Sequence, residues 1–420
     1  MVLKSVPLKK TRIYITLLLF AVLAFAATEL TACKSMFEAM PHKKWGFIDK
    51  TGKMVIEPQF DDVLRDQYGG CFPYTHRLFK NFSDGLCAVR VGNKWGYIDK
   101  TGKMVIAAKY DNAGTFSEGL GCVRLGSKCG YVDKTGRLAL PLQFDAYEQS
   151  NNARSDNPDW DFTSTLVEKF GFSEGLAVSR KDGKEGYIDH SGKFVIEPKF
   201  SSAAPFEDGV AKVESADNMR HFPGSNFIDK TGKPVINTQE LCIDLSDKVF
   251  LATNGKFDAT RKLYYLNQKG ERLSPKEFVD ARIFSEGLAA ASVKWADGPL
   301  GSQDTTYGYI DKTGEFVTPQ KFQISGNNLA GNFHSGRAIV SKTESDVMGN
   351  NHVICGIIDR KGNWVLKPKY NHISAYCDGL ARAFSDNGTV YLDMNGNEAV
   401  KTNSPWGNSF SEGLAAVMEK

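Results

Sequence analysis

The chain has 420 residues, a hydrophobic content of 41% and a formal net charge of +3. These fractions are typical of a folded protein and exclude a disordered chain. Residues 1–32 carry four basic residues against Glu29, which also gives +3, so the remainder is close to neutral. Nucleic-acid binding needs a basic field, so we predict no nucleic-acid partner.

The N-terminus has the pattern of an export signal. Basic residues at 4, 9, 10 and 12 precede an apolar run from Ile13 to Ala27. That run is of signal-peptide length and shorter than the roughly 20 residues of a membrane-spanning helix. We therefore predict that the protein is exported and that residues 1–32 are a signal peptide.

The end of this signal reads Leu30-Thr31-Ala32-Cys33 and resembles the bacterial lipoprotein signal. The resemblance implies cleavage before Cys33, lipidation of its thiol and anchoring in a membrane by several acyl chains. Lys34 is not the Asp of an inner-membrane retention signal, which favours an outer membrane. Glu29 departs from the usual uncharged flank. Cleavage near Ala24 to Ala27, with a periplasmic or secreted product, and an uncleaved anchor stay open as alternatives.

After a short tether at residues 33–42, one string recurs along the chain. It reads KWGFIDKTGKMVI at Lys44 to Ile56 and KWGYIDKTGKMVI at Lys94 to Ile106. Its turn residue recurs at intervals of 34 to 56 residues: Asp49, Asp99, Asp133, Asp189, Asp229, Asn267, Asp311, Asp359 and Asp393. Nine copies at such spacings indicate a tandem array with insertions.

The columns of this repeat predict short buried strands. An aliphatic residue always precedes the turn residue, as in Ile48 and Ile98, and an aromatic residue almost always precedes that, as in Phe47 and Tyr97. Neighbouring strand residues point to opposite faces, so each strand should offer an aliphatic side chain to one layer and an aromatic to the other. We expect a valine column, with Val55 and Val105, to contribute to the layers too.

Two turns complete the unit. In Asp-Lys-Thr-Gly the Asp side chain can accept N–H groups two residues on, and Gly supplies the positive φ of a short bulged hairpin. The second landmark, Phe-Ser-Glu-Gly-Leu-Ala at Phe172 to Ala177 and its variants, predicts another such turn. The minimal unit is then about three short strands.

These landmarks, recurring in the same order over residues 42–420, resemble the bacterial WG-repeat family. The Trp-Gly that names the family is kept at Trp45 and Trp95 but replaced at Cys129, Glu185, Tyr307 and Cys355. Members of that family are exported or lipid-anchored and mostly lack an assigned activity, so the resemblance implies an architecture and leaves the mechanism open.

We predict an all-β fold: a tandem array of about nine β-hairpin or three-strand repeats, open and solenoid-like, with a β-propeller as the alternative. The array should divide into an N-terminal part at 43–225, degenerate repeats at 226–275 and a C-terminal part at 276–420.

Specificity should lie in segments that do not repeat, because repeated residues serve the structure. Two long insertions precede Phe82 and Phe172, and others lie at 214–225, 292–306 and 341–353. Insertions at equivalent places should project from one edge or face. The candidate ligand contacts are aromatic or basic residues of the first insertion and acidic residues around a tryptophan in the second: Tyr68, Phe72, Tyr74, Arg77, Asp156, Asp159, Trp160 and Asp161.

Each candidate has a structural alternative. The acidic residues could hold calcium, but their loop lacks the Gly and distal Glu of an EF-hand, which favours a solvated loop. The aromatic residues of the first insertion suit sugar or peptide contact, but local packing explains them as well. We predict no metal site, no cofactor and no disulfide.

No catalytic motif is present, since the sequence contains no HExxH, GxSxG or phosphate-binding loop. We predict a non-catalytic scaffold at the cell envelope that is anchored to the membrane by its N-terminal lipid and binds a protein or glycan partner. An envelope hydrolase, with a site assembled from the insertions, is the alternative.

Overall fold

The computed structural model describes residues 43–64, 71–72, 75–78, 81–146, 169–215, 227–236, 238, 240–254, 261–293, 306–319, 322–323, 331–345, 351–385 and 388–419. Lys44–Lys420 forms one compact part and Met1–Lys43 another. The predicted signal peptide, tether and Cys33 lie outside the described residues. No helix within the described ranges is long and apolar enough to cross a membrane.

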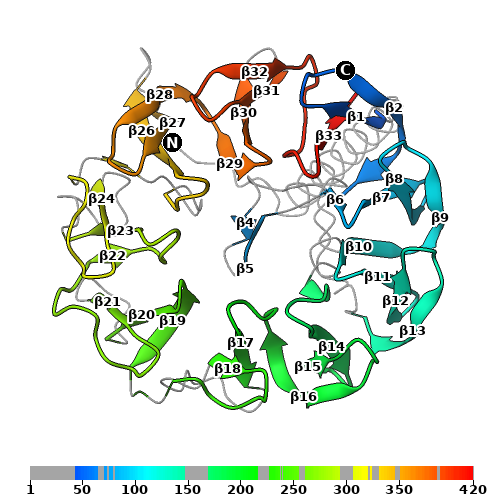
Figure 1. Cartoon of the computed structure of the whole chain (residues 1–420), viewed down its shortest axis with the longest axis horizontal. Coiled ribbons are helices and arrows are strands. Elements are labelled where there is room, and N and C mark those ends of the chain that lie inside the picture. Colours follow the sequence, from blue (N-terminus) through cyan, green and yellow to red (C-terminus); the bar gives the residue numbers. More distant parts are fainter. Residues whose placement is uncertain are drawn as a thin grey trace, which may run out of the picture. The chain divides into compact units, whose positions relative to one another are not determined.

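Every regular element of the described residues is a β-strand, and the strands pair antiparallel. We number the units 1 to 9 by their hairpins, from Asp49 to Asp393. Unit 3 shows the complete pattern of four strands: β10 (Asn112–Ser117), β11 (Leu120–Leu125), β12 (Lys128–Asp133) and β13 (Leu138–Asp145) (Figure 1). The predicted all-β tandem array is confirmed, and the structure adds a first strand that ends in the Phe-Ser of the second landmark, as β10 does in unit 3.

The other strands follow the same order. Unit 2 has β3 (Asp62–Val63), β6 (Phe82–Ser83), β7 (Leu86–Val91), β8 (Lys94–Asp99) and β9 (Met104–Tyr110), with a hairpin of β4 (Cys71–Phe72) and β5 (Thr75–Leu78) inserted after β3. Units 4 to 6 contain β14 (Ala177–Lys181), β15 (Lys184–Ile188), β16 (Phe194–Ala203), β17 (Val210–Ser215), β18 (Phe227–Asp229), β19 (Leu241–Ser246), β20 (Val249–Thr253) and β21 (Leu263–Leu266). Units 7 and 8 contain β22 (Asp280–Ala281), β23 (Ala289–Ser292), β24 (Thr306–Ile310), β25 (Phe322–Gln323), β26 (Arg337–Ser345), β27 (Asn351–Asp359) and β28 (Trp364–Tyr370). Unit 9 contains β29 (Ile373–Cys377), β30 (Leu380–Ser385), β31 (Gly388–Leu392) and β32 (Glu398–Lys401).

Unit 1 is assembled from both ends of the array. Its strands β1 (Trp45–Asp49) and β2 (Met54–Phe60) come from the beginning, and β33 (Leu414–Met418) comes from the end. β1 pairs with β33 over five residues, from Trp45 opposite Met418 to Asp49 opposite Leu414. The array therefore closes on itself. The expected open, solenoid-like form is corrected by this pairing, and the propeller-like alternative fits it, because the two strands satisfy each other's backbone groups.

The core lies between units rather than inside them. Tyr97 of unit 2 packs in one cluster with Val132 of unit 3, and Tyr309 of unit 7 packs with Ile358 of unit 8. The last joint is built the same way, with Tyr391 of unit 9 against Ile48 of unit 1. The aliphatic and aromatic columns are buried throughout, so the predicted two-sided burial is confirmed.

Most valines of the third column do not join these layers, although Val235 and Val365 are partly buried against them. Val55, Val195 and Val317 are 44%, 47% and 46% exposed, whereas the next residue in the first two strands, Ile56 or Ile196, is buried. Side chains alternate along a strand, and the valines lie on the solvent face of the fourth, outermost strand of the unit. The expectation that they contribute to the layers is wrong for these exposed valines and holds for Val235 and Val365.

A bulge in that outer strand explains the Gly of Trp-Gly. Across β8 and β9, Trp95 pairs with Tyr110 but Tyr97 with Ile106, so the outer strand has extra residues opposite Gly96. A Cβ at Gly96 would lie 2.4 Å from the carbonyl oxygen of Ile106. The close approach of the β9 backbone therefore requires Gly at this position, whereas the preceding Trp can be replaced.

The Asp-Lys-Thr-Gly hairpin has the predicted mechanism. In unit 3 the Oδ1 atom of Asp133 accepts hydrogen bonds from the Thr135 N–H at 2.9 Å, the Thr135 hydroxyl at 2.6 Å and the Arg137 N–H at 3.1 Å. Gly136 has a φ of 85°. In unit 6 the amide oxygen of Asn267 accepts the corresponding bonds from the N–H groups of Lys269 and Glu271.

This hairpin predicts a measurable acid sensitivity. The Thr135 hydroxyl, followed by the backbone N–H groups and Arg137, lowers the pKa of Asp133 from 3.8 to about 2. Its contribution to stability is therefore complete above about pH 4 and is lost as the pH falls through about 2. We expect Asp133→Asn, which keeps the acceptor oxygen but cannot titrate, to make the acid loss of stability shallower. The thermal midpoint measured from pH 6 to pH 2 checks this.

The chain supplies the reverse control. Asn267→Asp should steepen the same acid loss, because it adds a titrating carboxylate to an existing acceptor position. Identical pH profiles for the wild type and both variants would contradict this role of the turn carboxylates.

Candidate functional site

The second landmark forms a two-residue hairpin turn in which both central residues have positive φ. In unit 3 these residues are Glu118, at 54°, and Gly119, at 82°. This is the type I′ geometry that matches strand twist and prefers Asn-Gly or Asp-Gly. A Glu held there costs about 1–2 kcal/mol, which calls for a reason beyond the turn itself.

The reason is a hydrogen bond to the next unit. The Glu118 carboxylate accepts the N–H of Gly175, the turn glycine of unit 4, at 3.1 Å, and Asp84 of unit 2 accepts that of Gly119 at 2.7 Å. The same bond closes the array, since Glu412 of unit 1 accepts the Gly85 N–H of unit 2 at 3.1 Å. The remaining bonds of this kind are Gly209 to Glu174, Gly287 to Asp247, Gly336 to Glu286 and Gly413 to Asp378.

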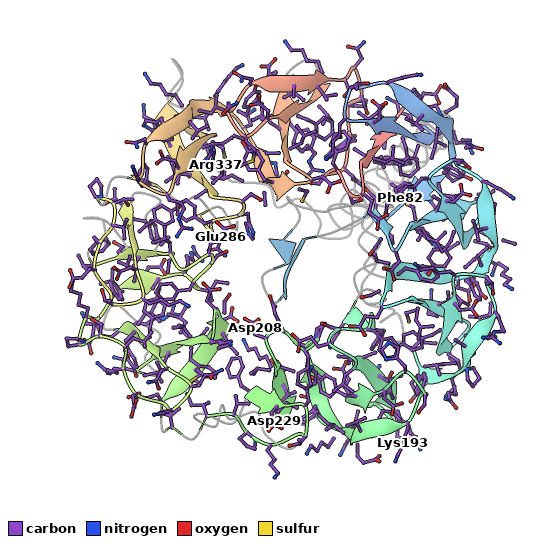
Figure 2. All side chains as sticks on the ribbon, viewed as in Figure 1. Phe82, Lys193, Asp208, Asp229, Glu286 and Arg337 are labelled. Carbon is purple, nitrogen blue, oxygen red and sulfur yellow. The ribbon has the colours of Figure 1, made fainter. Side chains whose placement is uncertain are left out.

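A basic residue from the first hairpin of the next unit contacts the same carboxylate. It is the residue after the turn Asp, as in Lys100 of unit 2, whose Nζ lies 3.0 Å from Glu412. In unit 8, Arg360 lies 3.5 Å from Glu286 of unit 7. Figure 2 labels Glu286 and also Arg337, the residue after the turn glycine Gly336 that Glu286 binds. The other pairs are Lys50 with Asp378, His190 with Glu118, Lys230 with Glu174 and Lys312 with Asp247. The landmark Glu and Lys therefore form a polar joint between units.

Two joints lack these contacts, and in both of them the basic residue of the next unit is absent. Between units 5 and 6, Asp208 makes no hydrogen bond or ion pair with another described residue. In unit 6, Lys248 stands where the turn Gly would be and Gln268 where the basic residue would be. Between units 8 and 9, Ser335 replaces the acid and Met394 replaces the base. The basic residue is thus absent at both joints, and between units 8 and 9 the acid is absent with it.

A buried ion pair occupies the tryptophan column of unit 4. Glu185 has 0% exposure, its carboxylate lies 2.8 and 2.9 Å from Lys169 Nζ, and it accepts the Ala203 N–H at 2.5 Å. Burial raises the pKa of Glu185 and lowers that of Lys169, to about 8 in each case.

Such perturbed pKa values are also found in catalytic groups. Here the carboxylate is inaccessible to a substrate, so we interpret the pair as structural: it fastens the end of the second insertion to β15. In the sequence, Glu185 stands out only as a replacement of Trp. A charged residue at a position that is buried in the other units indicates that an oppositely charged side chain lies beside it.

The predicted ligand contacts are not brought together by the described residues. Tyr68, Tyr74, Asp156, Asp159, Trp160 and Asp161 lie outside them, as does Cys33. Phe72 lies in β4 and Arg77 in β5, strands that pair with each other, but their side chains are not described. Within the described residues no group of three or more His, Cys, Asp or Glu could hold a metal ion. The six cysteines whose side chains the structure describes are buried and free.

The insertions leave the units at two places. The first two interrupt the first strand of units 2 and 4, after Leu64 and Ala146. The others connect the second and third strands, as between β17 and β18 or β23 and β24. This connection lies at the end of the sheet opposite the two repeated turns, because the strands alternate in direction. The expectation that insertions at equivalent places project from one edge or face stays a prediction, because most of the inserted residues lie outside the described ranges.

The joint carboxylates can be tested within one chain. Glu118→Ala removes the acceptor of the Gly175 N–H and the partner of His190, so we expect a loss of about 1 kcal/mol of stability. Asp208→Ala changes the same turn position, at a similar φ of 50°, but removes no contact, so its effect should stay within about 0.5 kcal/mol. Denaturant unfolding of both variants measures the difference, and equal effects would contradict the joint.

Comparison with known proteins agrees with the repeat pattern. A family model described as "WG containing repeat" matches residues 45–74, 79–95, 95–129, 186–218, 265–294, 307–344 and 356–388. No curated protein matches the chain.

Solved structures give only distant likenesses. KlHsv2 with loop 6CD replaced by a Gly-Ser linker has 9% identity and a TM-score of 0.34, covering 67% of this chain and 96% of that one. Apo AztD from Citrobacter koseri has 14% identity and a TM-score of 0.32, covering 79% and 97%. The V. cholerae biofilm matrix protein Bap1 has 9% identity and a TM-score of 0.26, covering 86% and 80%. With TM-scores this low, nothing is inferred from them.

The family matches together cover just over half of the 420 residues and fall on the hairpins and turns described above. The chain belongs to the family of proteins built from WG-containing repeats.

Proposed function

We propose that this protein is a non-catalytic repeat scaffold, exported and anchored at the cell envelope through Cys33, that binds a protein or glycan partner through its unrepeated segments. The observation that carries the proposal is the use of the repeated charged residues. Six of the joint carboxylates pair with a basic residue of the next unit, and seven accept a turn N–H. Side chains with these duties hold the array together and are not available for chemistry.

The unrepeated segments have no such duty. The array is complete without them, since unit 3 forms its four strands with short connections only. Long additions to a repeat framework that does not need them are common where repeat proteins bind their partners. An envelope hydrolase is the alternative, and it would need a site built from those same segments.

The anchoring part of the proposal is tested at Cys33. We expect the wild type in the membrane fraction and Cys33→Ser in the soluble fraction, because the variant cannot accept acyl chains. The two forms should also differ in electrophoretic mobility. Cys71→Ser is the matched control and should stay with the membrane. A Cys33→Ser protein that remains in the membrane fraction with unchanged mobility would overturn lipidation.

The binding part is tested by capture from envelope extracts. The bait is the chain without the signal peptide, residues 1–32. Its capture is compared with that of a variant in which a short Gly-Ser linker replaces residues 148–166. That boundary retains Lys169, which Glu185 needs. We expect the replacement of the insertion to abolish capture of a partner and to leave the thermal midpoint nearly unchanged, while Asp208→Ala changes neither. A second variant with residues 217–225 replaced tests the other kind of insertion. Undiminished capture by both variants would contradict the proposal.

A further inference from the structure

Three aromatic side chains gather where units 9 and 1 meet. The rings of Trp406 and Phe384 lie 5.5 Å apart at 72°, and those of Phe384 and His372 lie 5.7 Å apart at 43°. Trp406 is 57% exposed, the most of any large apolar residue in the described ranges. Its indole rests against the Phe384 ring and leaves more than half of its surface to solvent.

The backbone that carries Trp406 is fixed. The Met418 N–H donates to the Trp406 carbonyl at 3.0 Å, and the Asn408 N–H donates to the Ala416 carbonyl at 2.8 Å. The Arg382 guanidinium, which is 3% exposed, donates to the Gly407 carbonyl at 2.6 Å and lies 5.0 Å from the centre of the Phe384 ring. The backbone that carries the indole is therefore ordered before a ligand binds, which lowers the entropic cost of binding.

The array does not require an aromatic residue there. Trp406 lies four residues before the landmark Phe410. The same position varies among the other units, which hold Leu78, Asn112, Glu168, Ser202, Leu241, Asp280, Leu329 and His372 there. Because no other unit has a tryptophan at this position, the array does not need one, and a ligand explains an indole that is left exposed.

The surroundings indicate the kind of ligand. From Ile373 to Glu419, Trp406 is the single large apolar residue that the structure describes as exposed, and Lys401, Asn403 and Pro405 beside it are exposed as well. A stable protein interface buries about 800 Å² per partner around several apolar or aromatic anchors. One flat ring with a polar border instead matches a pyranose, which has a face of C–H groups and a rim of hydroxyls. The electron-rich indole face attracts such C–H groups.

We propose that Trp406, supported by Phe384, is a stacking platform for a neutral glycan of β-linked pyranose units. When the ring substituents are equatorial, the faces of such sugars are flat, so a whole ring can lie on the indole. The inference rests on the proposed binding function and names the ligand class for this part of the scaffold.

The test is calorimetric titration of the processed chain, with Cys33→Ser to keep it in solution, using cellotetraose and chitotetraose as probes and α-linked maltotetraose for comparison. We expect binding of at least one β-linked probe and at least tenfold weaker binding in Trp406→Ala, equivalent to about 1.4 kcal/mol. Trp406→Phe should recover part of the affinity. Trp364→Ala, which removes another exposed tryptophan, should bind as the wild type does.

The thermal midpoint separates a ligand role from a structural one. Trp406→Ala should leave it nearly unchanged, because the side chain is largely exposed. Absence of binding to any probe, a preference for maltotetraose, or equal binding by Trp406→Ala would overturn the glycan platform. Capture of a protein that depends on Trp406 without glycan binding would also overturn it, while leaving the scaffold proposal standing. Failure of the insertion variants to affect capture would count against the scaffold proposal alone.

Discussion

The structure depends on one repeated contact, the packing of an aromatic residue of one unit against an aliphatic residue of the next. Tyr97 with Val132 and Tyr391 with Ile48 are two examples of it. Neither side of this contact can be buried by a unit alone, so units are stable only as neighbours. Closure follows from the same need: the aromatic face of unit 9 is covered by unit 1, and the pairing of β1 with β33 fixes that arrangement. An open array would leave one aromatic and one aliphatic face in water.

Apolar packing does not determine which turn of the neighbouring unit lies opposite a given turn. The polar joints determine this. Seven of the turn carboxylates accept the turn N–H of one particular neighbour, and at six of them a basic residue of the same neighbour approaches from the adjacent hairpin. The cost is a Glu or Asp held at positive φ. Tyrosine hydroxyls provide a further link between units, as in the bond from Tyr97 to the Gly114 carbonyl at 2.8 Å.

Nine copies of one unit in a single chain show which residues serve the joints and which serve something else. Loss of the acid at Ser335 accompanies loss of the base at Met394, as expected for partners. Glu185 departs from the column in another way, because its charge is matched by Lys169 from an unrepeated segment. Trp406 departs without a structural need. A departure that no neighbour compensates is the clearest pointer to function in such a chain.

The sequence alone determined the all-β class, the nine hairpins, the buried columns and the turn chemistry, because each depends on contacts within about ten residues or on strict alternation along a strand. Closure could not be predicted, since it depends on β1 meeting β33 across nearly the whole chain. The exposure of the valine column was missed because a bulge and an outer edge decide which face of a strand is buried. The joints, the Glu185–Lys169 pair and the Trp406 platform were likewise decided by the tertiary structure, which brings together residues that no local pattern connects.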